Sequence, residues 1–258
     1  MNRRNFLYAS AAALAPLAAA PNSPSRSILE LRYMRLRTSP DNQMQRTSDF
    51  LRAAVPALKR SGISPVGFFA SVIGEESPFI LALASFPSIS AMEAARAREA
   101  EDKEYLQLVK TYTSNPSRGY ERLDSSLVRC FETMPSVELP PVDAQRAPRV
   151  FELRMYESPT SATLARKINM FNTGEIKIFQ RLGMQPVFCA ETIVGPRMPN
   201  LVYMLAFESL AAREKLWQAF GADPEWQKLR SLPGNNDTEN VSNISNSILR
   251  PLPYSDIR

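Results

Sequence analysis

Histidine is absent from this chain of 258 residues, and glycine and cysteine are scarce, with nine and two residues. Without an imidazole the chain cannot build a Ser-His-Asp triad, a His-ligated haem, a His-containing zinc site or an imidazole proton shuttle. Two cysteines alone cannot form a thiolate zinc site, and no phosphate-loop or dinucleotide glycine motif is found. Acid–base chemistry is left to Asp, Glu, Lys, Tyr or Cys. We therefore expect no metal and no other cofactor.

Charge of one sign is not concentrated in any part of the chain. The formal net charge is +5, and two of the basic residues, Arg3 and Arg4, lie in a first stretch that contains no acid. Elsewhere acids and bases are interspersed without a run of five like charges, and no nucleic-acid-binding motif occurs. We therefore expect no nucleic acid among the partners. Hydrophobic residues make up 44% of the chain, as is ordinary for a globular protein of one or two domains.

The chain begins MNRRNFLYASAAALAPLAAAPNSPS, in which two arginines precede an apolar stretch that ends in small residues. At about 15 residues, this stretch is shorter than the roughly 20 that span a bilayer, and it has the length of a signal peptide. The run RRNFL resembles a bacterial twin-arginine export signal. We expect residues 1–25 to direct export to the periplasm or the cell exterior, with cleavage near Ser25 and no stable membrane insertion afterwards. An uncleaved tether or a merely disordered N-terminus stays open.

Export bears on the two cysteines. An oxidising compartment permits a disulfide between Cys130 and Cys189. The sequence does not tell whether the two side chains can meet, so the disulfide stays open.

The chain repeats itself at the spacing of 121 residues that separates Gly62 from Gly183. SGISPVGFFASVIGE (61–75) aligns with LGMQPVFCAETIVGP (182–196), and FILALASF (79–86) aligns with NLVYMLAF (200–207). The opening segments ILELRY (28–33) and VFELRMY (150–156) match at a spacing of 122. Two copies are too few for a solenoid, so we interpret them as paired domains.

Each copy has the same predicted order of elements. Residues 151–156 alternate apolar and polar side chains, the pattern of a half-buried strand. Residues 163–182 carry apolar side chains at helical spacing and are followed by Gly183, a suitable C-terminal cap. Two apolar strands and a helix capped by Ser209 come next. This β-α-β-β-α order is that of a ferredoxin-like unit, which leaves one face of its sheet in need of a partner.

The segment DPEWQKL, which begins at Asp223, is compatible with a catalytic carboxylate pair or with a helix start. Asp223 fits an N-cap with Pro224 at the first helical position, where a missing N–H costs nothing. Asp223 and Glu225 are two residues apart and diverge on a helix, so they make a poor acid–base pair. We predict a helix start, with Trp226 packed inward.

We predict an α+β fold in which two tandem ferredoxin-like domains form a pseudo-symmetric dimeric α/β barrel. The expected segments are the export signal (1–25), a first, divergent domain (26–132), a proline-rich linker (133–149) and a second domain (150–258).

The second half carries the motifs FELRMY, RLGMQPV, VGP, NLVYMLAFESLAAREKLWQAF and DPEWQKL in this order. Together they resemble the NIPSNAP family over residues 150–254, and more weakly over 28–131 through GISPVG, FPSISAM and DKEYLQL. The resemblance implies the dimeric α/β-barrel form of the ferredoxin-like fold and, with tandem domains behind an export signal, a bacterial secreted member. The family has no firmly assigned catalytic chemistry. The activities of similarly folded monooxygenases and haem-degrading enzymes do not transfer with the fold.

Polar residues on the opening strands are the first candidates for a ligand site. Glu30 and Arg32 in one copy, and Glu152, Arg154 and Tyr156 in the other, point away from the apolar face of their strand. If that polar face looks into the barrel, two Glu–Arg pairs meet near the pseudo-dyad and can hold an anionic ligand. The alternative, which we favour, is a structural ion-pair network between the two halves.

Differences between the copies supply a second set of candidates. The second copy has Cys189, Glu191 and Tyr203 where the first has Phe68, Ala70 and Ala82. These residues lie on neighbouring strands and can line one polar cavity between sheet and helices, with a Glu base and a Tyr donor. The alternative, again favoured, is a core cysteine, a rim glutamate and a packed tyrosine.

The leading hypothesis is an exported NIPSNAP-type protein that acts as a binding or interaction module, with a small anionic or apolar molecule held in the barrel. The alternative is a cofactor-independent enzyme, an oxygenase, isomerase or lyase, that uses Glu191, Tyr203 or the Glu152–Arg154 pair. A monomer and a homo-oligomer formed by further pairing both stay open.

Overall fold

The computed structural model describes residues 25–38, 41–141 and 148–258, and it contains two α/β units that follow each other along the chain. The first unit consists of β1 (Ile28–Arg35), α1 (Gln43–Arg60), β2 (Val66–Ile73), β3 (Phe79–Phe86), α2 (Ile89–Glu101), α3 (Lys103–Thr113) and β4 (Arg122–Cys130). The second unit consists of β5 (Val150–Glu157), α4 (Ser161–Met170), the π-helical turn η1 (Phe171–Glu175), α5 (Ile176–Arg181), β6 (Gln185–Val194), β7 (Asn200–Phe207), α6 (Leu210–Ala222), α7 (Pro224–Arg230), α8 (Asp237–Asn240) and β8 (Asn243–Pro251).

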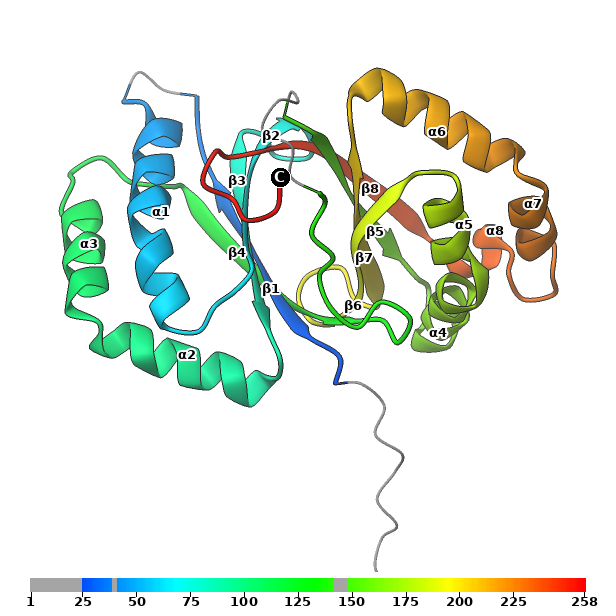
Figure 1. Ribbon diagram of the computed structural model, residues 1–258, viewed down its shortest axis with the longest axis horizontal. Coiled ribbons are helices and arrows are strands. Elements are labelled where there is room, and N and C mark those ends of the chain that lie inside the picture. Colours follow the sequence, from blue (N-terminus) through cyan, green and yellow to red (C-terminus); the bar gives the residue numbers. More distant parts are fainter. Residues whose placement is uncertain (1–24, 39–40, 142–147) are drawn as a thin grey trace, which may run out of the picture.

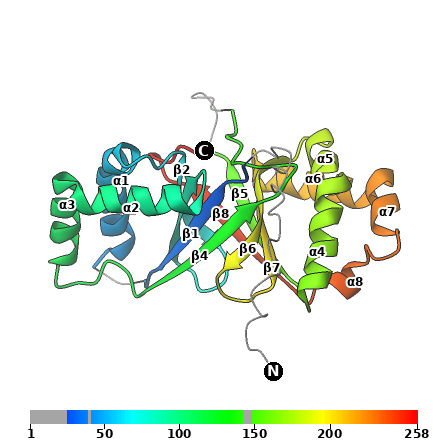
Figure 2. The same ribbon diagram turned by 90° about the horizontal axis from the view of Figure 1, so that it is seen from below.

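The strands of both units form one closed antiparallel barrel. Their order is β4-β1-β3-β2 in the first unit and β8-β5-β7-β6 in the second, which is the order of a ferredoxin-like sheet. The outer strands join the sheets, because β2 pairs with β8 and β4 pairs with β6. Helices α1 to α3 cover one flank of the barrel and α4 to α8 cover the other (Figures 1 and 2). The predicted fold is confirmed, and closure leaves neither sheet with an unpaired edge.

Apolar side chains fill the barrel interior from alternate positions of the strands. Leu29 and Leu31 of β1 meet Phe151 and Leu153 of β5 in a single buried cluster. Two further clusters lie between each sheet and its own helices. Each sheet therefore has two covered faces, one toward the other sheet and one toward the helices.

One end of the barrel is closed by segments that follow the last strand of each unit. Ile257, next to the C-terminus, is fully buried in the interior cluster, and Val137 from the linker packs against it. Backbone hydrogen bonds hold the tail in place, from Leu252 N–H to the Phe68 carbonyl at 2.8 Å and from Asp256 N–H to the Val66 carbonyl at 2.9 Å. At the opposite end of the barrel, where β1 ends, Tyr33 and Arg35 line a pocket.

The helix predicted over residues 163–182 is present as α4, η1 and α5, from Ser161 to Arg181. Gly183 follows it with a φ of 82°, and Gly62 has the same place after α1 with a φ of 86°. Both glycines fit the left-handed conformation that ends a helix. The π-helical turn was not predicted, since such turns are rare insertions within α-helices.

Asp223 caps the N-terminus of α7, as predicted. Its carboxylate accepts the backbone N–H groups of Glu225 at 3.1 Å and Trp226 at 3.0 Å. Pro224 stands in the first turn, and Trp226 is buried. The carboxylate thus belongs to the helix start and not to a catalytic pair.

The first repeat contains the same cap. Asp102 accepts the N–H of Tyr105 at 3.0 Å, at the start of α3. Arginines at equivalent positions reinforce both caps, with Arg60 at 2.8 Å from Asp102 and Arg181 at 2.8 Å from Asp223. The repeat at 121 residues is therefore visible in individual ion pairs as well as in the strand order.

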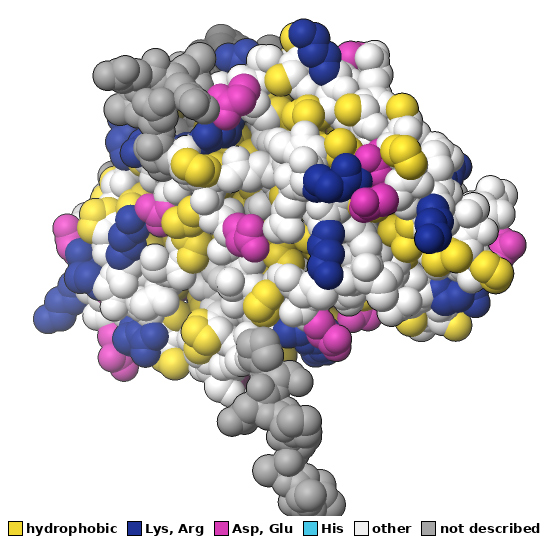
Figure 3. Space-filling model, turned by 45° about the vertical axis from the view of Figure 1, so that its right-hand side comes forward, with side chains coloured by type: hydrophobic (Ala, Val, Ile, Leu, Met, Phe, Trp, Pro, Cys, Tyr) yellow, Lys and Arg dark blue, Asp and Glu magenta, His cyan; other side chains and the backbone are white. Residues whose placement is uncertain are grey.

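The predicted export signal lies outside the described residues, apart from Ser25. Within the described ranges, no helix combines the length and apolar character needed to cross a bilayer. Acidic and basic side chains are interspersed on the face shown in Figure 3, in keeping with the distribution of charge along the sequence.

Candidate functional site

The polar residues of β5 face the helices of their own unit and not the barrel interior. Their strand neighbours Phe151 and Leu153 point into the barrel, so the alternation of side chains turns Glu152 toward α6. In the same way Glu30 of β1 faces α2, where it pairs with Arg96. The polar faces therefore do not look into the barrel, and the condition for the two Glu–Arg pairs to meet near the pseudo-dyad is not met. The favoured alternative, a network between the two halves, is not found for these residues either, because the ion pairs of Glu30 and Glu152 stay within their own repeat. The barrel core separates the pairs, because the apolar strand faces are those that the two sheets bury against each other.

Glu152 is the centre of an ion-pair network in the second repeat. It has no exposed surface and accepts hydrogen bonds from Arg213 at 2.6 Å, Trp217 at 2.7 Å and Arg154 at 2.9 Å. Burial alone would raise the pKa of Glu152, but the donors Arg213 and Trp217 and the charge of Arg154 lower it below its ordinary value. The guanidinium of Arg154 also lies 4.6 Å from the centre of the Trp217 ring. Glu152 and Arg154 are thus both paired with other side chains of this chain.

Tyr203 fills the middle of the space between the second-repeat sheet and its helices. It is fully buried, and its hydroxyl is 2.9 Å from the hydroxyl of Tyr156. The rings of Phe171 and Phe179 lie 5.1 and 6.0 Å from its ring. Burial raises the pKa of Tyr203 well above its ordinary value. This tyrosine is packed as a core residue, and its hydroxyl is engaged by Tyr156.

Cys189 and Glu191 do not form a polar cavity with Tyr203. Cys189 is the cross-strand neighbour of Tyr203 and is buried in the same cluster. Glu191 is half-buried two residues farther along β6, opposite Leu201, and lines neither of the two cavities described below. Cys130 and Cys189 are free thiols. Cys130 belongs to the barrel interior and Cys189 to the helix side, so the two thiols lie on opposite faces of the sheet.

In the first repeat, the corresponding space between sheet and helices is open. A cavity of about 230 Å³ lies between its sheet and helices α1 and α3. Ala82 and Ala84 line this cavity and are partly exposed, whereas Tyr203 and Leu205 at the equivalent positions of the second repeat are 0% exposed. The strand register supports the equivalence, since Ala82 lies opposite Arg32 as Tyr203 lies opposite Arg154. Two small side chains thus leave the space that two large ones fill.

Aromatic and aliphatic side chains make up most of the cavity wall, and they include Phe50, Leu58, Ile63, Phe68, Tyr105 and Tyr112. Phe50 stacks on Tyr112 with ring centres 4.3 Å apart. The Tyr112 hydroxyl is 2.9 Å from the Thr47 hydroxyl. These contacts fix the wall formed by α1 and α3.

The wall is polar where Glu30, Arg32 and Arg96 come together. Glu30 is 7% exposed and accepts hydrogen bonds from Arg32 at 2.8 Å and from Arg96. Arg96 also donates to Glu99 at 2.6 Å. Arg96 occupies the position that Trp217 has in the second repeat. Of the residues predicted from the sequence to bind a ligand, Glu30 and Arg32 thus line a cavity.

Sequence reasoning missed Arg96, Tyr105, Tyr112 and the two alanines. The available signal was the exchange of Tyr203 for Ala82, which marks the repeat with the smaller side chain as the open one. No group of acids and cysteines within the described ranges is arranged to hold a metal ion.

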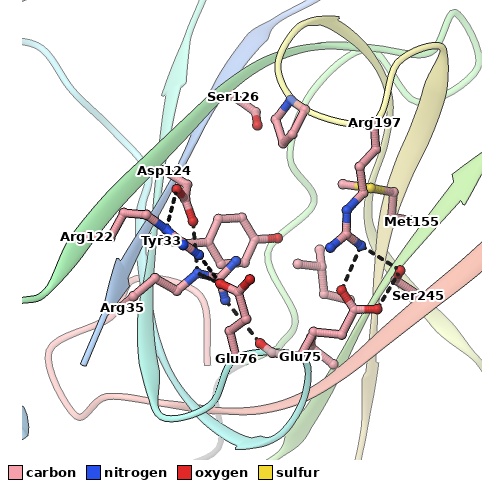
Figure 4. A pocket seen from close by; sticks show the side chains of 13 residues that line it. Tyr33, Arg35, Glu75, Glu76, Arg122, Asp124, Ser126, Met155, Arg197 and Ser245 are labelled. Atoms are coloured by element: carbon pink, nitrogen blue, oxygen red, sulfur yellow. Dashed lines mark hydrogen bonds and ion pairs between the residues drawn. The ribbon is translucent and has the colours of Figure 1, made fainter. Parts of the chain in front are cut away.

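A second pocket, of about 210 Å³, lies at the open end of the barrel (Figure 4). The turns after β2 and β6 contribute to its walls, and Glu76 and Arg197 in these turns have positive φ angles of 54° and 60°. We call this pocket the barrel mouth. Its charged residues are Arg35, Arg122, Glu75, Glu76 and Asp124 from the first repeat and Arg197 from the second.

Comparison with known proteins identifies the family of both repeats. The NIPSNAP family model matches residues 29–129 and again residues 151–256. The chain belongs to the NIPSNAP family. It carries two NIPSNAP domains, one on each side of the linker. No protein with a curated functional description matches this NIPSNAP chain in sequence.

Solved structures resemble the tandem NIPSNAP fold at low sequence identity. A provisionally named monooxygenase from Lactobacillus acidophilus has a TM-score of 0.55 at 9% identity, over 88% of this chain and 94% of that one. A second provisionally named monooxygenase, from Fusobacterium nucleatum, has a TM-score of 0.57 at 6% identity, over 88% and 93%. An uncharacterised NIPSNAP-like protein from Burkholderia xenovorans is 23% identical over 42% of this chain and 88% of its own, with a TM-score of 0.37. At such identities the likeness shows the fold alone, and the biochemical activity stays undefined.

Proposed function

We propose that this NIPSNAP protein binds a small, largely apolar molecule with a polar group at one end, in the cavity of its first repeat. The observation that carries the proposal is the exchange of Tyr203 and Leu205 for Ala82 and Ala84. Protein interiors are close-packed, and an apolar void lowers stability in proportion to its volume. The second repeat fills the space between its sheet and its helices with large side chains, and the first repeat leaves that space open. A ligand can fill the open space.

The cavity wall indicates the chemistry of the ligand. Its volume of about 230 Å³ is below the ~300–1,000 Å³ of typical drug-sized sites, so the molecule is small. Aromatic walls suit a flat or branched apolar body. At the polar end, Arg32 keeps 36% of its side chain exposed and has an ion pair with Glu30 through Nε. Its remaining N–H groups suit an oxygen acceptor on the ligand.

Binding has better support than catalysis. The enzyme hypothesis needs Glu191 and Tyr203 to face one substrate, but Tyr203 is buried and bonded to Tyr156. The Glu152–Arg154 pair is likewise engaged by Arg213 and Trp217.

Isothermal titration calorimetry of the purified protein with 4-methylbenzoate tests the proposal. Ala82→Tyr places in the cavity the side chain that fills the second repeat, and we expect it to weaken binding at least tenfold. Ala97→Tyr is the matched control, because Ala97 is exposed on α2. Native mass spectrometry of the same preparations shows whether a small molecule copurifies with the wild type and not with Ala82→Tyr. Equal binding by wild type and Ala82→Tyr would overturn the proposal.

Export from a bacterial cell is a separate part of the proposal, and it rests on the sequence of residues 1–25. The mass of the protein recovered from an export-competent bacterial host tests it. Loss of a segment that ends near Ser25 is expected. A full-length mass that includes Met1 would rule out a cleaved signal.

A further inference from the structure

We propose that the barrel mouth is a second ligand site, separate from the first-repeat cavity, and that it binds a small aliphatic carboxylate. The pocket lies on the pseudo-dyad, because positions related by the repeat line it together: Ser126 with Ser247 and Glu76 with Arg197. This proposal does not depend on the function proposed for the first repeat.

Hydrogen bonding at the mouth leaves donors, rather than acceptors, available to a ligand. Both oxygens of Glu75 are occupied, by Ser245 at 3.0 Å and by Arg197 at 2.7 Å. Both oxygens of Asp124 are occupied as well, by Arg122 at 3.0 Å and by Arg35 at 2.9 Å. Glu76 is paired as well, with Arg122 and Arg35, so the acids of the mouth are already engaged by arginines of the protein.

Arg197 has donor capacity to spare. A guanidinium carries five N–H donors, and the contacts of Arg197 with Glu75 and Ser245 both use Nη1. Its side chain is 40% exposed. A carboxylate can bind the remaining donors with two parallel hydrogen bonds. The three arginines of the mouth balance its three acids, so an added anion does not enter a negative field.

Tyr33 supplies a further donor from inside the pocket. Its hydroxyl points into the mouth, across from Arg197 (Figure 4), and has no hydrogen-bond partner within the described residues. Burial raises the pKa of Tyr33 to about 12, so the phenol stays protonated at neutral pH. The ring is held by Phe79 at 5.4 Å and by the guanidinium of Arg35 at 4.7 Å.

Apolar side chains complete the pocket below its charged rim. Leu153 and Met155 of β5 line it beside Tyr33. The volume of about 210 Å³ corresponds to roughly seven waters at ~30 Å³ each. A short unbranched acid such as hexanoate fits this combination, with its carboxylate at Arg197 and its chain on Leu153 and Met155.

Calorimetric titration of the purified protein with hexanoate tests the site, with hexanamide as the neutral probe of the same shape. We expect hexanoate to bind and hexanamide to bind at least tenfold more weakly. Arg197→Gly should weaken hexanoate binding at least tenfold, and glycine accepts the φ of 60° at this position. Tyr33→Phe, which removes only the hydroxyl, should weaken binding about three- to tenfold. Ala82→Tyr, in which the first-repeat cavity is filled, should still bind hexanoate and should lose that binding when Arg197→Gly is added, which separates this site from the cavity.

Three results would overturn the proposal. They are the absence of hexanoate binding to the wild type at millimolar concentration, equal binding of hexanamide, and unchanged hexanoate binding in both Arg197→Gly and Tyr33→Phe. If Arg197→Gly does not fold, Tyr33→Phe alone decides, since it keeps the ring that packs against Phe79.

Discussion

Ala82 and Tyr203 each lie across from the arginine on the first strand of their own repeat, Arg32 and Arg154. One side chain is a methyl group beside a cavity, and the other is a buried ring whose hydroxyl bonds to Tyr156. The two repeats thus have the same backbone order and opposite packing at one position. This difference leads to the first prediction.

Tyr203→Ala should open in the second repeat the space that exists in the first. We expect a loss of about 3–5 kcal/mol in the free energy of unfolding, as for other large-to-small changes in a packed core. The change also removes one of the two hydrogen-bond partners of the buried Tyr156 hydroxyl, which keeps only the bond from Arg154 at 3.1 Å. Urea unfolding measures the loss. Tyr203→Phe keeps the ring and should lose only about 1 kcal/mol, so equal losses in the two variants would contradict the packing argument.

Glu152→Gln should destabilise the protein much more than Glu30→Gln does. Glu152 is 0% exposed and is the common acceptor for Arg154 and Arg213. Its neutralisation leaves buried positive charge unpaired, at about 3–5 kcal/mol. Glu30 pairs with Arg32 and Arg96, whose side chains are 36% and 29% exposed. Water can solvate both arginines when the carboxylate is neutralised, so we expect a smaller loss there, of about 1–2 kcal/mol. Chemical unfolding of both variants tests the difference, which similar losses would disprove.

The same carboxylate predicts how stability depends on pH. The pKa of Glu152 is lowered in the folded protein from an ordinary value of 4.5, so the unfolded chain takes up its proton first as the pH falls. The stabilisation is complete above pH 4.5 and is lost as the pH decreases through the lower, native pKa. Unfolding midpoints of wild type and Glu152→Gln, measured from about pH 7 to about pH 3, should therefore converge in acid. A constant gap across this range would show that Glu152 does not stay ionised.

Both thiols should be inert in the folded protein. Burial raises the pKa of Cys130 to about 12 and that of Cys189 well above its ordinary value. The thiolate is the reactive form, so a thiol reagent should label neither residue until the chain unfolds. The labelled mass in native buffer and in denaturant tests this. Fast native labelling, or a mass shift on reduction, would contradict the free, buried thiols.

Much of the architecture could be predicted from the sequence, because repeat spacing and alternation report directly on strands and caps. Gly183, Ser209 and Asp223 all have the predicted capping roles. Alternation along residues 151–156 gave the two faces of β5. It did not tell which face meets the other sheet, since both faces of a sheet in this barrel are covered.

The site was less accessible to sequence reasoning. Glu30 and Arg32 were candidates because their charges are conspicuous, and they do line a cavity. The residue that opens the space, Ala82, has no functional group and draws attention only beside Tyr203. The barrel mouth gathers Tyr33, Arg197 and Asp124 from distant segments, and no local pattern relates them.

Joining both halves in one polypeptide changes what substitution can achieve. In a homodimer of single domains, an alanine at the position of Tyr203 would hollow both flanks at once and weaken the assembly twice. In the tandem chain the second repeat keeps its packed aromatic side chains and stabilises the barrel. The sequence of the first repeat can then change independently. The barrel mouth between the two repeats need not be symmetric either. It can therefore offer an arginine from one half and a phenol from the other to an asymmetric ligand.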